Sequence, residues 1–155
     1  MNEVEKAYLA GFLDGEGSIS MRKKLTKRGW VNWQLTVSIS NTSLAVMKFI
    51  RDLIQKEGVE TEMYHIYQGV LYTKNECKEK KRVYYVLRWT SQKASKVLSI
   101  ILSYLVVKRK QAELAIQFQK LMSKHYCSTG IPTWNTVQRE TLIQQCKALN
   151  RGLEE

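Results

Sequence analysis

The chain has 155 residues, of which 25 are basic and 14 acidic, so its formal net charge is +11. A charge of this size favours a polyanionic partner such as nucleic acid. The longest apolar run, residues 97–107, is shorter than the roughly 20 residues that a membrane span needs and is interrupted by polar side chains, so we expect no membrane partner.

Residues 1–20 lack the basic and then apolar pattern of a signal peptide, and the acidic residues among them argue against a transit peptide. We therefore expect the protein in the cytoplasm of a prokaryote, or in a chloroplast or mitochondrion that encodes it. The three cysteines are widely spaced and form no Cys-x-x-Cys pair, which argues against a zinc site or a disulfide scaffold.

The first predicted element is a helix over residues 4–15, in which apolar residues occupy much of the circumference. This pattern is typical of a helix that is buried on more than one side. Ala7, Gly11 and Gly15 recur at every fourth position, and together they leave a groove of small residues that another helix could approach closely. The two glycines that flank Glu16 end the helix.

Two strands are predicted next, over residues 18–25 and 32–40, with a basic turn between them. Polar and apolar side chains alternate along the second strand, which predicts a sheet with one buried and one polar face. No acidic residue falls between Ser18 and Asn41, whereas a face that is only solvated would be expected to mix both charges. A β-ribbon of this kind can enter the major groove of DNA. The candidate DNA contacts are Ser20, Arg22, Lys24, Lys27, Arg28, Asn32, Gln34, Thr36 and Ser38.

A helix over residues 43–57 follows, with Thr42 or Ser43 as its N-cap and Gly58 as its stop. A second hairpin is predicted over residues 59–90, with its turn somewhere in residues 74–81. Its candidate DNA contacts are Arg82, Tyr84 and Arg88, and a further one is Lys110. Helices over residues 91–105, 108–124 and 136–151 complete the chain, with a loop over residues 126–135. No linker is evident, so we expect a single α+β domain over residues 1–155.

Two carboxylates, Asp14 and Glu16, fall at the end of the first helix. The C-terminal end of a helix is partly negative, so acidic groups there need compensation, which a divalent cation could supply. Carboxylate oxygens and a free backbone carbonyl suit Mg²⁺. Taken alone, these residues are explained better as an ordinary polar turn.

The longer sequence Leu9-Ala10-Gly11-Phe12-Leu13-Asp14-Gly15-Glu16-Gly17 closely resembles the signature of the LAGLIDADG homing endonucleases. The resemblance implies an αββαββα core whose antiparallel hairpins form a DNA-binding saddle, followed by C-terminal helices. It also implies that Glu16 binds a catalytic metal with help from the Gly15 carbonyl, while Asp14 occupies a position that is usually structural. Mg²⁺ is the expected metal, and Mn²⁺ or Ca²⁺ can occupy such a site.

The resemblance implies two further catalytic positions. Lys108 lies in the sequence Lys108-Arg109-Lys110-Gln111-Ala112, where single-motif members of the family have an active-site lysine. Asn41 ends the second strand, where those enzymes often place a glutamine that orders solvent. Thr42 takes that place if the alignment shifts by one residue.

Only one copy of the motif is present, whereas a twofold site needs two, so we expect a homodimer that packs through the first helix. The expected interface residues are Ala7, Tyr8, Ala10, Gly11 and Asp14. The family implies hydrolysis of both strands of a long, near-palindromic DNA site, without a small-molecule cofactor.

Two alternatives remain open at this point. One is an intron-splicing maturase or a non-cutting DNA-binding regulator on the same fold; the presence of both Glu16 and Lys108 argues against it. The other is a basic RNA-binding module without an active site. Such a module would more often expose aromatic residues on its sheet, whereas Trp33 and Trp89 fall on the apolar side of the predicted strands.

Overall fold

A computed structural model describes residues 1–25, 31–68, 71–73, 76–78, 82–123 and 135–151. The described α-helices are α1 (Glu3–Glu16), α2 (Leu44–Lys56), α3 (Ser91–Ile101), α4 (Arg109–Ser123) and α5 (Thr136–Asn150), and a 3-10 turn, η1 (Leu102–Tyr104), follows α3. The described strands are β1 (Gly17–Leu25), β2 (Val31–Asn41), β3 (Glu62–Gln68), β4 (Leu71–Thr73), β5 (Glu76–Lys78) and β6 (Arg82–Thr90).

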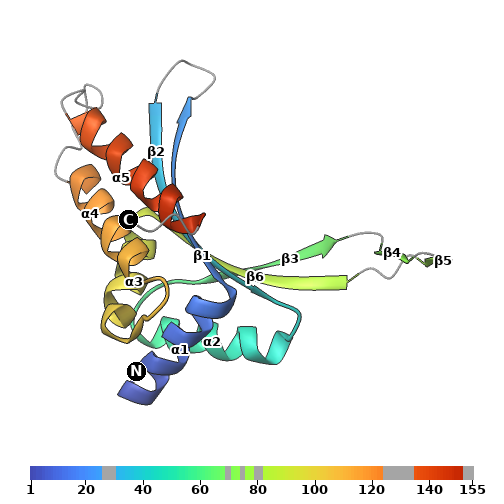
Figure 1. The fold of residues 1–155 in the computed structure, drawn as a ribbon. Helices are drawn as coiled ribbons and strands as arrows, with labels where there is room; N and C mark the ends of the chain where they lie inside the picture. Colours follow the sequence, from blue (N-terminus) through green and yellow to red (C-terminus); the bar gives the residue numbers. More distant parts are fainter. Residues whose placement is uncertain (26–30, 69–70, 74–75, 79–81, 124–134, 152–155) are drawn as a thin grey trace.

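The main sheet is antiparallel with the strand order β1-β2-β6-β3, and β4 and β5 form a separate two-stranded ribbon. Figure 1 shows the β1–β2 hairpin and the β3–β6 hairpin running in different directions from the centre of the sheet, with α3, α4 and α5 on one side. The predicted α+β class and the αββαββα order with C-terminal helices are confirmed.

The alternation along β2 divides the sheet into a covered face and an open face. Trp33, Leu35, Val37 and Ile39 are at most 3% exposed, and the three residues between them are partly exposed. The covered face packs against α3 and α4, where the Trp33 and Phe118 rings meet edge to face with centroids 6.3 Å apart. Each large apolar side chain buried here contributes roughly 2–5 kcal/mol, judged by what truncation to alanine costs in other cores.

Helix α1 begins at a capping box, in which the Asn2 side chain accepts from the Glu5 backbone and the Glu5 carboxylate accepts from the Asn2 backbone. The helix buries Leu9, Ala10 and Leu13 against the rest of the chain. The expectation that Ala10 lies in a dimer interface is therefore wrong, because its exposure within one chain is already 0%. A helix with apolar residues on several sides does not reveal which side its own sheet covers.

Helix α2 shows which of the two predicted N-caps is used. The Ser43 hydroxyl accepts a hydrogen bond from the Val46 backbone at 3.5 Å, and the helix is followed by Gly58 with φ +68°, as predicted. The predicted helix over residues 91–105 is too long, because the α-helix ends at Ile101 and η1 continues it. Leu105 is nevertheless buried, so the apolar spacing identified the core residue correctly but not the type of helix.

Some predictions fall on residues outside the described part of the chain. They are Lys27 and Arg28, residues 74–75 and 79–81 of the predicted turn region, and most of the loop over residues 126–135. Of the helices that the structure describes, none has the length and apolar character to cross a membrane.

Candidate functional site

The site is built around the end of α1, where the helix passes directly into β1. Glu16 is the last helical residue and its side chain is exposed. A Cβ atom at Gly17 would lie 2.3 Å from the Leu13 side chain and 2.5 Å from its carbonyl oxygen, so this abrupt change from helix to strand requires glycine. The last turn of α1 contains no basic residue, which leaves the partly negative helix end to be compensated from elsewhere.

The Asp14 carboxylate holds the segment that joins η1 to α4. It accepts hydrogen bonds from the backbone N–H groups of Val106 at 2.8 Å, Val107 at 3.2 Å and Lys108 at 2.8 Å. Hydrogen bonds to a charged acceptor are stronger than those between neutral groups. The structural role implied for Asp14 thus takes the form of a clamp between two segments 92–94 residues apart in the chain. The carboxylate is engaged within its own chain, and its place in a dimer interface stays a prediction.

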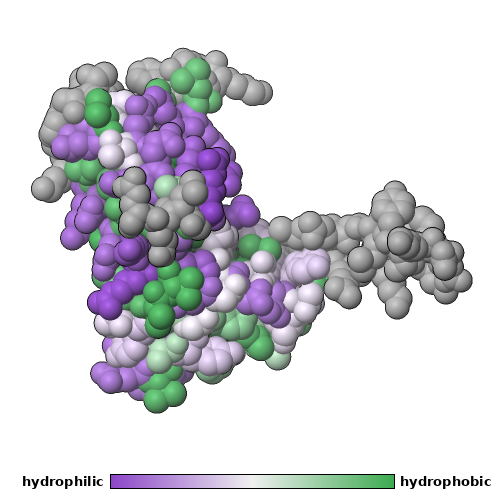
Figure 2. Space-filling view, in the orientation of Figure 1, coloured by the Kyte–Doolittle hydropathy of each residue, from purple (hydrophilic) through white to green (hydrophobic). Residues whose placement is uncertain are grey.

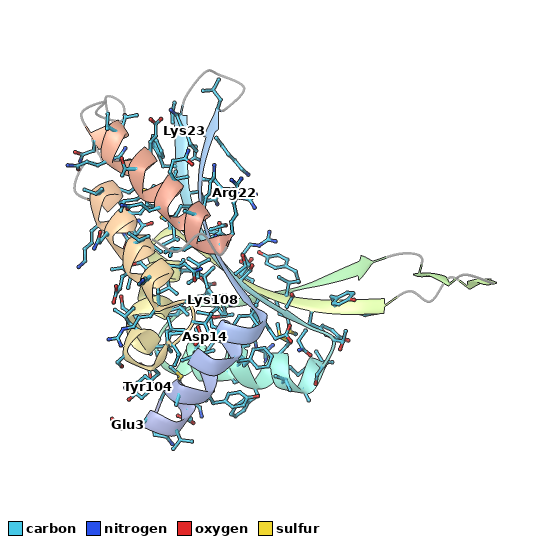
Figure 3. The ribbon with its side chains drawn as sticks, viewed as in Figure 1. Glu3, Asp14, Arg22, Lys23, Tyr104 and Lys108 are labelled. Atoms are coloured by element: carbon cyan, nitrogen blue, oxygen red, sulfur yellow. The ribbon has the colours of Figure 1, made fainter. Side chains whose placement is uncertain are left out.

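Lys108 completes this connection in the opposite direction. Its ammonium group donates to the backbone carbonyl of Asp14, and Figure 3 shows the two residues side by side at the end of α1. A cation at the C-terminal end of a helix compensates the helix dipole. The Lys108 carbonyl in turn accepts from the Ala112 backbone at 2.9 Å and so begins α4. The structure therefore brings the predicted lysine to the helix end that carries Glu16.

Asn41 ends β2 at the same end of the sheet. Gly17 pairs with Ile39, two residues before Asn41. The amide oxygen of Asn41 accepts from the Ser43 backbone at 2.8 Å, in the turn that leads into α2. The solvent-ordering role of Asn41 stays a prediction.

The donor set at the end of α1 suits a hard divalent cation. The Glu16 carboxylate and the Gly15 carbonyl offer oxygen atoms, the donors that Mg²⁺ and Ca²⁺ prefer. However, no three His, Cys, Asp or Glu side chains within the described part of the chain are grouped as metal ligands would be. The Asp14 carboxylate is engaged by backbone groups, so Glu16 is the exposed carboxylate at this helix end.

The register of the sheet gathers the predicted DNA contacts on the open face. Arg22 lies opposite Gln34, and Lys24 lies opposite Asn32. Ser38 lies opposite Arg88 of β6, which extends the same face across the sheet. The described predicted contacts on this face are Ser20, Arg22, Lys24, Asn32, Gln34, Thr36, Ser38, Tyr84 and Arg88. Arg82 has the same parity, although its side chain lies outside the described part. Lys110 is exposed in the first turn of α4.

The basic residues on the side of the sheet that the helices cover are engaged by other groups of the chain. Lys23 forms an ion pair with Glu140 of α5 at 2.5 Å and lies 5.3 Å from the centre of the Trp33 ring. Arg139 is 2% exposed, lies 5.7 Å from the same ring and donates to the Leu121 carbonyl at 3.1 Å. Burial lowers the pKa of the Arg139 guanidinium. Figure 3 shows Lys23 on the side of β1 toward α5, and Arg22 on the other side.

Sequence reasoning missed two residues on the open face, Glu62 and Tyr64 of β3. Glu62 lies directly opposite Arg88, and the Tyr64 hydroxyl donates to the Glu62 carboxylate. This hydrogen bond raises the pKa of the Tyr64 hydroxyl. The pairing of β3 with β6 places Glu62 opposite Arg88, and Tyr64, two residues later, lies on the same face. Without this register, the sequence does not show which residues of β3 face the open side.

The outer side of α1 has no covering element in the described structure. Ala7 is exposed, and added Cβ atoms at Gly11 and Gly15 would meet nothing within 4 Å. Tyr8 is 43% exposed and meets Phe49 of α2 edge to face, with ring centroids 5.7 Å apart. Figure 2 shows hydrophilic residues gathered over the end of the molecule that holds β1, β2 and α5, and more neutral and apolar residues around α1 and α2.

Solved structures of homing endonucleases have the same fold as this chain. The homing endonuclease I-CvuI, in complex with the I-CreI target and Mg, superimposes with a TM-score of 0.67 and 16% identity over 95% of this chain and 82% of that one. The archaeal intron-encoded homing endonuclease I-Vdi141I, complexed with DNA, has a TM-score of 0.66 and 15% sequence identity. The alignment covers 97% of this chain and 93% of that one. The meganuclease I-SmaMI, bound to DNA, has a TM-score of 0.57 and 17% sequence identity. That alignment covers 97% of this chain but 45% of the I-SmaMI chain.

Among curated protein sequences, none matches this chain. The profile of the LAGLIDADG-like domain matches residues 3–102, which is well over half of the chain. The matched region contains α1 with its glycine-flanked Glu16 and the whole four-stranded sheet. The chain therefore belongs to the LAGLIDADG-like family, and its fold is that of the solved LAGLIDADG homing endonucleases.

Proposed function

We propose that two copies of this chain form a divalent-metal-dependent endonuclease that hydrolyses both strands of a long, near-palindromic site in double-stranded DNA. The observation that carries the proposal is the placement of the Lys108 ammonium, clamped through Asp14, at the helix end that bears the exposed Glu16 carboxylate. Glu16 is exposed, and the partly buried Lys108 is held by its hydrogen bonds with Asp14, so a carboxylate and an ammonium group lie at one helix end, as a phosphodiester-cleaving site requires.

The open face of the sheet supplies the DNA-binding surface. Arg22, Lys24 and Arg88 are exposed on it. Arginine and lysine side chains pair with guanine, and asparagine and glutamine pair with adenine, so Asn32 and Gln34 add a second kind of contact. The net charge of +11 supports binding to the phosphate backbone, which makes the affinity strongly dependent on salt.

The outer side of α1 supplies the dimer contact. Ala7, Gly11 and Gly15 present a surface without bulky side chains, along which two helices can pack closely. Packing of one α1 against another is an isologous contact, and it brings two Glu16 carboxylates together on the twofold axis. A twofold protein reads two related half-sites, and this symmetry is the reason for a near-palindromic target.

Each charged group then has a definite task. Glu16 and the Gly15 carbonyl hold the cation, and the solved I-CvuI complexes with Mg and with Ca support this choice of metal. A bound divalent cation activates water and stabilises the leaving oxygen. The Lys108 ammonium has three N–H donors, of which Asp14 accepts one. Its remaining donors can stabilise the negative charge that develops on the phosphate.

The test is cleavage of a randomised double-stranded DNA library in Mg²⁺ by the wild type and by Glu16→Gln. We expect specific products from the wild type and none from Glu16→Gln, because the amide replaces a charged metal ligand. Glu113→Gln makes the same chemical change on an exposed part of α4, where Glu113 pairs with Arg109, and should cut as the wild type does. Equal cutting by the Glu16 and Glu113 variants would contradict the proposed metal site.

Binding of a specific site without cutting, in Mg²⁺ and in Mn²⁺, would favour the maturase or regulator function instead. Preference for RNA over double-stranded DNA in the same assay would favour the RNA-binding module. A sedimentation measurement on the same preparation shows whether the active species is a dimer.

A further inference from the structure

The open face contains one acidic residue in its four strands, and it lies on the second hairpin. β1, β2 and β6 have no aspartate or glutamate, whereas β3 begins with Glu62. The register places Glu62 opposite Arg88, and Arg88 opposite Ser38 of β2. Glu62 therefore lies within the surface that the proposed function assigns to DNA, and the inference that follows rests on that proposed function.

The Glu62 carboxylate is oriented by its neighbours on the same face. The Tyr64 hydroxyl, two residues along the strand, donates to one of the carboxylate oxygens. A carboxylate has two oxygens with about four acceptor positions between them, so capacity for a further donor remains. The nearby Lys93 is engaged elsewhere, in an ion pair with Glu60 at 2.6 Å.

An acid on a DNA-binding surface is unfavourable unless the DNA gives it a donor. Phosphates repel it, and contact with the groove removes its water. In the major groove the donors are the amino groups of cytosine and adenine. The neighbour of Glu62 decides between these two bases, because Arg88 presents paired donors that fit guanine O6 and N7. Directly opposed residues of neighbouring strands have Cβ atoms about 5 Å apart, so the two side chains can reach the same base pair.

We infer that Glu62 and Arg88 read one C·G base pair in each half-site. The Glu62 carboxylate accepts from the cytosine N4 amino group, and the Arg88 guanidinium donates to O6 and N7 of the guanine paired with it. Tyr64 is a positioning residue that holds the carboxylate through its hydroxyl. Glu62 is thus a specificity-determining residue, which excludes the other base pairs because they leave its carboxylate or the guanidinium without a partner.

The experiment is selection of bound sites from a randomised double-stranded library, with Ca²⁺ in place of Mg²⁺ so that binding is read without cutting. The full-length wild type, Glu62→Gln and Arg88→Met are compared. Glu60→Gln is the matched control, because it removes the same charge two residues away, from a side chain paired with Lys93. In the wild type we expect a C·G preference at one position of each half-site. In Glu62→Gln that preference should fall by about 5- to 150-fold, the range of a good base contact.

Glu62→Gln should also bind unrelated DNA at least as tightly as the wild type, because a repulsive charge is gone; a residue that only supports the fold would not have this effect. Arg88→Met must lose preference at the same base pair, and Glu60→Gln must leave the profile unchanged. An unchanged Glu62→Gln profile, or losses at different base pairs in the two variants, overturns the inference while the proposed function stands. A wild type that selects no site at all overturns both.

Discussion

The two faces of the sheet use neighbouring lysines in opposite ways. Lys23, on the covered face, is paired with Glu140 and lies over the Trp33 ring. Lys24 follows it in the chain but points to the open face, opposite Asn32. On the side that α5 approaches, the lysine pairs with an acidic residue of the chain although its side chain is 41% exposed. On the other side, no described element covers the sheet and Lys24 is exposed. The difference agrees with the proposal that the open face binds DNA.

The largest expected effect concerns Lys108, whose ammonium group donates to the Asp14 carbonyl at the end of α1. We expect Lys108→Met to lower the cleavage rate by about 100- to 1,000-fold, the range for loss of a group that stabilises transition-state charge. DNA binding, measured in Ca²⁺, should change little. Lys110→Met is the comparison, because Lys110 is an exposed side chain of the same short segment and a candidate DNA contact, so its loss should weaken binding in Ca²⁺ rather than slow the cutting step. A larger loss in Lys110→Met would transfer the active-site assignment to that lysine.

The Asp14 carboxylate joins the end of α1 to residues 106–108, so its loss should lower both the stability of the chain and the rate of cleavage. Asp14→Asn keeps the size of the side chain but removes the charge that accepts three backbone N–H groups. We expect the free energy of unfolding to fall by about 1–3 kcal/mol and cleavage to fall with it, as measured by denaturant titration and by assay. Asp52→Asn should change stability little, since Asp52 is 56% exposed and its described ion pair is with the adjacent Arg51. Equal stabilities of the two variants would contradict the clamp.

Three single substitutions on one strand test the comparison of faces directly. Arg22→Met and Lys24→Met should each weaken DNA binding and reduce the slope of log affinity against log salt by about 0.9 for every phosphate that the variant no longer neutralises. Lys23→Met should leave the slope unchanged and alter stability by about 0–1 kcal/mol, as expected for an exposed ion pair. The measurement is binding over a series of salt concentrations. A Lys23 variant that behaves like the other two would mean that the faces are not distinct.

The smallest effect is expected on α1, where the helix has its own covered and open sides. Gly11→Ala should raise the free energy of unfolding of the monomer by about 0.5–1 kcal/mol, because nothing lies within 4 Å of the new methyl group. The same change should weaken dimerisation, since the methyl occupies the proposed contact between helices. Denaturation at low protein concentration and sedimentation at high concentration separate the two effects. Dimerisation that is as strong as in the wild type would place the interface elsewhere.

Local patterns predicted the fold well because the physics behind them is local. The period-two alternation around Trp33 and Leu35 gave the faces of β2, and capping chemistry placed the start of α2 at one of two residues. Glu16 and Lys108 were found through resemblance to a family motif, and the structure places them at the same helix end.

The remaining features depend on contacts between distant parts of the chain. No pattern around Asp14 indicates that its carboxylate binds backbone groups of residues 106–108. Ala10 was assigned to an interface because a helix with several apolar sides gives no orientation. Glu62 was missed because strand register, which decides the face of a residue, is set by the partner strand.

The clamp between Asp14 and residues 106–108 joins two helix ends, and none of its hydrogen bonds involves a side chain from the open face of the sheet. The groups proposed for hydrolysis and those proposed for recognition are thus attached to the scaffold independently. Substitutions among Arg22, Gln34 and Arg88 can alter which DNA sequence is bound without displacing the groups assigned to hydrolysis. Under the proposed function, variants of the strand residues can therefore be screened for new sites while the proposed cutting centre is kept constant.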